Sequence, residues 1–188
     1  MRKNILAIAL MVVLMAATVA VNAWTIDDAI IEAEVGSGDA TSYLVVDFGA
    51  ASYAFKYNYN SNTAKTGMDL ITDIRSANIG FDFSDSYGFI DRIAYGSYDQ
   101  TSDWNADGTF WSYWTGTTGG SLGSASTGAG GRALSNNTWD GWSWGTDTTI
   151  WPEPQPDIPG VPEPSSLMAM CSLIGLTASA KLLRYRSK

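Results

Sequence analysis

Histidine is absent from the 188 residues, and cysteine occurs once, as Cys171. Without histidine, neither a Ser-His-Asp catalytic arrangement nor a histidine-based zinc site can form. Cys171 lies inside a C-terminal apolar run, where a cysteine usually acts as a small hydrophobic residue. The segment before it can therefore hold no disulfide and no thiolate metal site, and its stability must come from packing.

Basic residues are scarce in the middle of the chain. Residues 24–160 hold five of them against eighteen acidic residues, whereas the whole chain carries a net charge of −8. A domain this acidic is repelled by phosphate backbones, which excludes nucleic acid as a partner. The acids are scattered, and no spacing singles out a glycosidase pair. The sequence therefore predicts a non-enzymatic protein with no cofactor.

Abundant tryptophan (8), tyrosine (9) and glycine (19), with only 16% charged residues, are typical of an exported β-rich protein. The length allows one domain of ordinary size plus tails. We therefore expect a single exported domain over residues 24–150.

The first 23 residues have the three parts of a secretory signal peptide. Arg2 and Lys3 precede an apolar stretch from residue 5 to about 21, and Val21-Asn22-Ala23 is a small-x-small cleavage pattern. Cleavage after Ala23 would start the mature chain at Trp24. The alternative is a membrane helix that is retained.

The C-terminal segment, residues 161–188, has a different three-part pattern. The motif Val161-Pro162-Glu163-Pro164 stands before an apolar run over residues 167–183, which carries one charge and is near the lower limit for a membrane-spanning helix. A basic tail follows it. Positive residues flank both apolar ends of the chain, so both ends are expected to face the cytoplasm and the acidic middle to lie outside.

This tail closely resembles the PEP-CTERM sorting signal of Gram-negative bacteria. The resemblance implies an exosortase of the inner membrane as partner, with cleavage near the motif. It also implies export through the secretion translocon, anchoring in the inner membrane before processing, and a final place at the cell surface or outside the cell. Whether the tail is removed or retained stays open.

Pro-Glu-Pro also occurs at residues 152–154, away from the apolar run. We assign this first copy to a proline-rich linker over residues 151–160, because proline favours an extended, semi-rigid spacer. The linker is expected to hold the domain clear of the membrane.

The central domain shows short strands and one helix. Residues 25–34 fit a short helix or an opening strand. Tyr53-x-Phe55-x-Tyr57-x-Tyr59 alternates with period two, and Gly49-Ala50-Ala51 stands between two β-forming runs, which predicts a hairpin. Thr66 can cap a helix over about 66–77. Later strands are expected in "GFIDRIAYGSY", "FWSYWTG" and "GRALSNNTWDGWSWG". The fold class is therefore α+β, a small mainly antiparallel sheet with one packed helix, flanked by a signal-peptide helix and a C-terminal membrane-spanning helix.

A second resemblance covers residues 42–145. The order of "TGMDLITDI", "GFIDRIAYG", "FWSYWTG" and "GAGGRALSNNTWDGWSWG" resembles the blocks of the transcobalamin C-terminal-like domain, a small β-rich extracellular module. The chain departs from that pattern in placing Asp140-Gly141-Trp142 late and in its glycine- and serine-rich loop at 116–131. Cobalamin binding therefore does not carry over, and the resemblance implies only an exported ligand-binding or adhesion module.

The most unusual local chemistry is a cluster of aromatic residues. Because alternate residues of a strand share a face, Trp111 should lie with Tyr113 and Trp142 with Trp144, while Trp114 turns the other way. The cluster is either the core of a small domain or an exposed platform on which a sugar ring or a flat macrocycle rests. Exposed Trp111 or Trp142 would favour the platform, and burial would favour the core.

The segment "DWNADG" matches the start of a calcium loop, with Asp103, Asn105 and Asp107 at alternate positions. The twelfth position, where a bidentate acid should stand, is Trp114. The alternative is a polar turn that binds nothing.

Two functions remain from different classes. The first is an exported, exosortase-processed surface or extracellular-matrix protein of structural or adhesive role, associated with exopolysaccharide. The second is an extracellular module that binds a glycan or a cobalamin-like ligand through its tryptophan face.

Overall fold

The computed structural model describes residues 28–106, 108–118, 120, 122–145 and 155–160, which belong to one compact unit, Trp24–Val161. Three predicted features lie outside the described residues. They are the signal peptide with its cleavage point at Ala23, the motif at 161–164 and the C-terminal apolar run. Within those residues, no helix combines the length and the apolar character needed to cross a bilayer.

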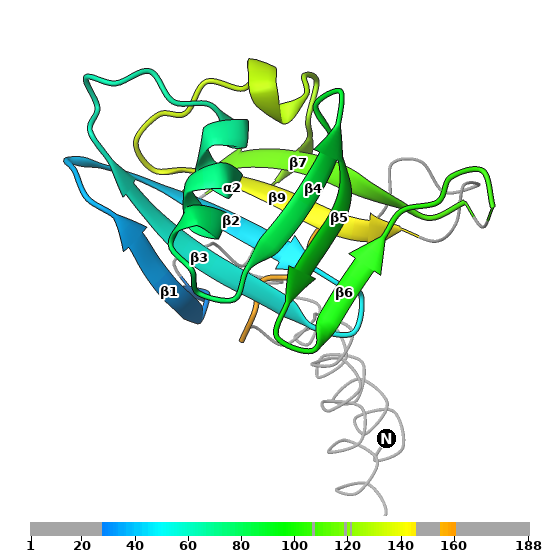
Figure 1. Cartoon of the computed structure of the whole chain (residues 1–188). Helices are drawn as coiled ribbons and strands as arrows, with labels where there is room; N and C mark the ends of the chain where they lie inside the picture. Colours follow the sequence, from blue (N-terminus) through cyan, green and yellow to red (C-terminus); the bar gives the residue numbers. More distant parts are fainter. Residues whose placement is uncertain (1–27, 107, 119, 121, 146–154, 161–188) are drawn as a thin grey trace, which may run out of the picture. The chain divides into compact units, whose positions relative to one another are not determined.

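In the described part of the chain most of the fold is sheet, arranged as two antiparallel-rich sheets with one α-helix (Figure 1). The larger sheet has the strand order β1-β3-β2-β9-β7-β8 and the smaller one the order β4-β5-β6. The strands of the larger sheet are β1 (Ile31–Gly36), β2 (Ala40–Asp47), β3 (Ser52–Tyr59), β7 (Phe110–Thr117), β8 (Gly123–Ser124) and β9 (Thr138–Gly145). Those of the smaller sheet are β4 (Asp82–Ser86), β5 (Phe89–Tyr95) and β6 (Tyr98–Thr101). The prediction of a mainly β domain with a helix is confirmed.

The hairpin predicted around Gly49 joins β2 to β3, with Asp47 opposite Ser52. Gly49 has φ +81°, a left-handed conformation that glycine adopts without strain, and its amide donates to the carboxylate of Asp47. Two pairings of the larger sheet are parallel, β1 with β3 and β2 with β9. The second of these brings the last strand of the domain into the centre of the sheet, beside one of the first.

Helix α2 (Gly67–Ser76) begins at the predicted cap. The Thr66 side chain accepts from the Asp69 amide, and the Asp69 carboxylate accepts from the Thr66 amide, which completes a capping box. Its apolar face is fully buried through Leu70, Ile71 and Ile74. The chain leaves the helix through Asn78 at φ +55°, a left-handed position that asparagine tolerates.

The helix and the smaller sheet both cover one face of the larger sheet, called here the inner face (Figure 1). Side chains of α2, β4 and β5 form a single apolar core with alternate residues of β2, β3, β7 and β9. Aromatic rings make up much of it: the Phe55 ring lies edge-on to Phe81 and Tyr95 at centroid distances of 5.3 and 4.9 Å. This core explains how the domain folds without a disulfide.

The opposite, outer face of the larger sheet has its own small core, formed by Val45, Ala54, Trp114, Leu122 and Trp139. Residues 155–160, part of the predicted spacer, lie against this face. Pro156 is buried and approaches Gly141, where a Cβ atom would stand 2.9 Å from the proline Cγ. We therefore call residues 155–160 the strap.

Candidate ligand-binding site

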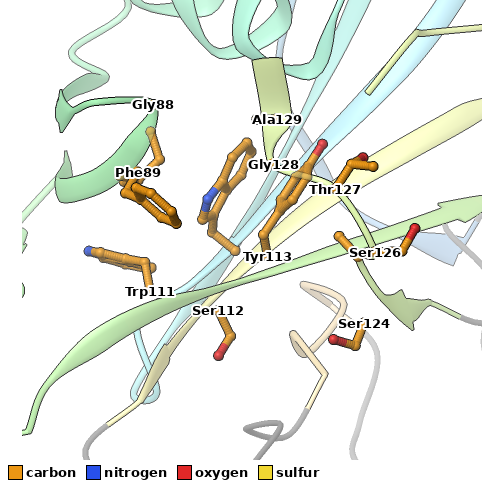
Figure 2. A pocket seen from close by; sticks show the side chains of 13 residues that line it. Gly88, Phe89, Trp111, Ser112, Tyr113, Ser124, Ser126, Thr127, Gly128 and Ala129 are labelled. Carbon is orange, nitrogen blue, oxygen red and sulfur yellow. The ribbon is translucent and has the colours of Figure 1, made fainter. Parts of the chain in front are cut away.

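A cavity of about 290 Å³ opens on the inner side between β7, the β4–β5 hairpin and the chain that follows β8. Figure 2 shows Trp111 and Tyr113 of β7 on one side, Phe89 of the hairpin on another, and the segment Ser124–Ala129 closing the third. Trp142 of β9 also lines the cavity. The chain thus brings three of its predicted aromatic site residues to one hollow.

The aromatic floor follows from strand register. Trp111 stands opposite Trp144 and Tyr113 opposite Trp142 in the β7–β9 ladder. The rings of Tyr113 and Trp142 stack at 4.6 Å, and those of Trp111 and Trp144 meet at 5.1 Å. Cross-strand aromatic pairs of this kind stabilise a sheet and fix the rings in one orientation. The floor is therefore rigid before any ligand arrives.

Trp114 lies on the outer face, away from the cavity, where its indole donates to Ser143 Oγ at 3.2 Å. Trp144 packs on Trp111 and is not among the residues that line the cavity. Of the five ligand candidates, the structure thus brings together Trp111, Tyr113 and Trp142.

The exposure of Trp111 is 9% and that of Trp142 is 2%. By the criterion of exposure, both belong to the core, which favours a structural role for them. Both residues line the floor of the cavity, but too little of either side chain is exposed to form an open platform. The exposed aromatic surface is supplied instead by the hairpin.

The hydroxyl of Tyr113 is bound to a buried charged pair, Asp140 with Arg132. This hydroxyl donates to Asp140 Oδ2 at 2.5 Å, and Arg132 Nε lies 3.3 Å from Asp140 Oδ1. Asp140 is fully buried, and burial raises the pKa of its carboxyl despite the hydrogen bond from Tyr113 and the charge of Arg132. Burial and the adjacent carboxylate also raise the pKa of Tyr113, so its phenol stays protonated.

This pair also meets the start of α2. The Gly67 amide donates to the Arg132 carbonyl, and a Cβ atom at Gly67 would stand 2.3 Å from Asp140 Oδ2. The carboxylate therefore sits close to the positive end of the helix. Helix, pair and cavity wall form one connected unit.

The third wall is polar. Ser124, Ser126 and Thr127 are exposed and line the cavity. Within the described residues, none of their three hydroxyls has a hydrogen-bond partner. Ser112 also lines the cavity, but Figure 2 shows its side chain on the opposite side of β7 from Trp111 and Tyr113. The loop thus supplies free donors and acceptors at the rim.

The β4–β5 hairpin carries two exposed aromatic residues at its tip. Ser86 pairs with Phe89, so the turn consists of Tyr87 and Gly88, with φ +55° and +85°. Two positive φ values define a turn that favours Asn-Gly or Asp-Gly, and tyrosine is unusual at its first position. Tyr87 is fully exposed and Phe89 is 76% exposed.

The predicted calcium loop is a turn in this structure. Asp103 Oδ1 accepts from the Ala106 amide at 2.9 Å, and the Asp103 amide donates to Thr109 Oγ1. Asp107 lies outside the described residues, which contain no cluster of three or more metal-ligating acids. Calcium binding by Asp103, Asn105 and Asp107 stays a prediction.

Sequence reasoning missed Phe89 and the rim hydroxyls. The signal for Phe89 was present, because Tyr87-Gly88-Phe89 places two aromatic residues around a turn glycine, where polar residues are usual. Ser124, Ser126 and Thr127 belong to the glycine- and serine-rich loop at 116–131, whose composition alone does not indicate a binding site. Comparison of the chain with protein-family models, curated proteins and solved structures finds no match.

Proposed function

We propose that this chain is an exported surface or extracellular-matrix protein of structural or adhesive role, delivered by a PEP-CTERM sorting tail. In this proposal residues 1–23 form the signal peptide, and residues 167–183 span the inner membrane until an exosortase acts near Val161-Pro162-Glu163-Pro164. The observation that carries the proposal is the order of motif, apolar run and basic tail in the last 28 residues.

The fold supports delivery from one membrane surface. The Ile30 amide donates to the Pro159 carbonyl at 3.0 Å, so the first and last described parts of the domain lie side by side. Before the signal peptide is removed, a domain whose two ends lie side by side can be joined at both ends to segments of the same membrane. Because the strap contacts the sheet, the motif at 161–164 follows directly after the folded part.

The proposal is tested in a host that carries an exosortase, with Glu163→Ala in the full chain. The wild-type chain is expected at the surface or in the medium, and the variant in the inner-membrane fraction. Glu153→Ala changes the first Pro-Glu-Pro and is the matched control, expected to behave as wild type. Equal sorting of the wild-type chain and the Glu163 variant would overturn the proposal.

A second candidate function is extracellular glycan binding, and the cavity beside Trp111, Tyr113 and Trp142 favours it. Aromatic floors with a few polar groups at the rim are the usual form of a small-ligand site. A volume of about 290 Å³ is at the small end of such sites, which are roughly 300–1,000 Å³, and favours one sugar ring over a cobalamin-like macrocycle. Calorimetry with polysaccharides and with cobalamin tests it: heat with cobalamin alone would contradict the glycan assignment.

A further inference from the structure

Among the residues that the structure describes, no charged side chain lines the cavity. Each described lining residue is apolar, aromatic, glycine, serine or threonine. The nearest charged pair described above, Asp140 with Arg132, is separated from it by Tyr113, whose hydroxyl is already committed to Asp140. The surrounding domain is strongly acidic, so an anionic ligand would be repelled and would find no cation to pair with. The cavity therefore suits a neutral ligand.

Exposed side-chain hydroxyl groups stand on one wall of the cavity, that of Ser124, Ser126 and Thr127. The indole of Trp111 donates to the Gln100 carbonyl at 3.3 Å and Tyr113 donates to Asp140, so the polar groups of these two rings are used within the protein. Ser124, Ser126 and Thr127 keep hydroxyls that can both donate and accept. A ligand with an apolar face and hydroxyl groups on its edge matches this division, and a sugar ring has both.

The hairpin tip supplies the missing exposed ring. Phe89 lines the cavity and yet is 76% exposed, so its ring has free surface at the mouth. Tyr87 is held fully exposed in a left-handed conformation that strains a residue other than glycine, asparagine or aspartate. Strain retained beside a cavity points to function, because a polar residue would suit the turn better. The two rings extend the aromatic surface from the cavity into solvent.

Resting on the glycan-binding candidate above, we propose that the cavity binds one neutral pyranose ring of a polysaccharide. Phe89 stacks on this ring, and the hydroxyls of Ser124, Ser126 and Thr127 bind its edge. Tyr87 contacts the next sugar of the chain outside the cavity. We call Tyr87, Gly88 and Phe89 the aromatic arm.

Ligand charge is tested by calorimetry on the full chain in a detergent without a sugar headgroup. Galactose oligomers are compared with galacturonate oligomers of the same length, because the two differ at C6 by a carboxylate. Glucose and mannose oligomers cover other neutral rings. At least one neutral series is expected to bind, and galacturonate is expected to bind more weakly than galactose or not at all.

Variants at exposed positions of the aromatic arm and of the polar wall test the individual contacts, and their exposure means that the fold should be kept. Phe89→Ala is expected to weaken neutral oligomer binding about tenfold, the effect of losing one aromatic stack. Ser126→Ala with Thr127→Ala is expected to weaken it by a similar factor, about tenfold, through two lost hydrogen bonds. Trp104→Ala is the matched control, since Trp104 is another exposed aromatic residue, at 57%, and does not line the cavity.

Tyr87→Asn distinguishes the role of the Tyr87 ring in binding from the effect of this position on the stability of the turn. Asparagine suits the left-handed position, so this variant is expected to melt at the same or a higher temperature than wild type. It should bind long oligomers several-fold more weakly and a single sugar unchanged, because Tyr87 lies outside the cavity. A variant that binds long oligomers as well as wild type would remove Tyr87 from the site.

The outcomes separate the two proposals. Preference for galacturonate would overturn the neutral-sugar inference and leave glycan binding standing. Binding of neutral sugar that is equally weakened by Phe89→Ala and Trp104→Ala would overturn the assignment to this cavity. No heat with any saccharide would overturn glycan binding itself, while the sorting assay would still decide export. A Phe89→Ala variant that changes only the association state would identify the arm as a contact between copies of the chain and overturn the inference.

Discussion

Tyr113 of β7 donates a 2.5 Å hydrogen bond to the fully buried carboxylate of Asp140 on the neighbouring strand β9. Through this bond the wall of the cavity is tied to Arg132 and to the start of α2. A buried carboxylate is costly unless it is paired, and here one cation, one phenol and a helix N-terminus lie around it. The pair therefore belongs to the architecture that fixes Tyr113 at the wall of the cavity.

Replacing Asp140 tests this role. Asp140→Ala leaves Arg132 without its anion and Tyr113 without its acceptor, and we expect a loss of about 3–5 kcal/mol in the free energy of unfolding. Asp140→Asn keeps an acceptor for Tyr113 and should cost less. Urea unfolding of both variants measures the two losses. Equal stability of wild type and the alanine variant would show that the pair contributes nothing net.

Gly67→Ala is expected to change stability in the direction opposite to that predicted by helix propensity. Alanine is favoured over glycine in a helix interior by about 1 kcal/mol. At this site, however, a Cβ atom would stand 2.3 Å from Asp140 Oδ2 and 2.4 Å from the Tyr113 hydroxyl. We expect the variant to melt at a lower temperature than wild type. Gly130→Ala is the control, since its Cβ would meet nothing within 4 Å, and it should be nearly neutral.

Local patterns in the sequence predicted the elements well. Thr66 caps α2, the alternation of Tyr53, Phe55, Tyr57 and Tyr59 forms β3, and the hairpin at Gly49 joins β2 to β3. Each of these depends on side chains a few residues apart. Strand alternation also predicts that Trp111 and Tyr113 lie on one face of the sheet and Trp114 on the other, as they do in the structure.

Contacts between distant segments could not be read in the same way. The parallel pairing of β2 with β9 joins residues 96 positions apart, as in the bond between Ser42 and Thr138. The cavity likewise combines Phe89 with Ser126 and Trp142, and no spacing rule connects them. Trp142 is buried because the smaller sheet and α2 cover the inner face of the larger sheet. Its exposure therefore could not be predicted without the fold.

The strap offers a test of how far the folded domain extends. Ile158 packs against the outer core, and the Asp157 amide donates to Asp47 Oδ2 at 3.0 Å. We expect Ile158→Ser to lower the free energy of unfolding by roughly 1–2 kcal/mol through lost apolar burial. Thermal unfolding of the variant measures this loss. Gln155→Ala, at an exposed position in the same segment, is the control. An Ile158→Ser variant as stable as this control would restore the view of residues 155–160 as a free spacer.

A partly exposed cluster around Asp73 of α2 should respond to pH. Lys65 Nζ lies 2.7 Å from Asp73 Oδ2, and the Tyr57 hydroxyl donates to the same oxygen. Burial alone would raise the pKa of Asp73, but the hydrogen bonds from Lys65 and Tyr57 lower it below its ordinary value of 3.8. Burial and the adjacent carboxylate raise the pKa of Tyr57 to about 12.

Asp73→Asn should therefore cost stability only where the carboxylate is ionised. A lowered pKa in the folded state means that the contribution is complete above 3.8 and disappears as pH falls through the folded-state pKa. We expect a loss of about 0.5–1 kcal/mol at neutral pH, since the Asp73 side chain is more than a third exposed and solvent screens the pair. Urea unfolding at neutral pH and well below 3.8 checks this, with Lys65→Met as the companion variant that removes the partner. Both differences from wild type should shrink in acid; a difference that stays constant would mean that the cluster acts through packing and not through charge.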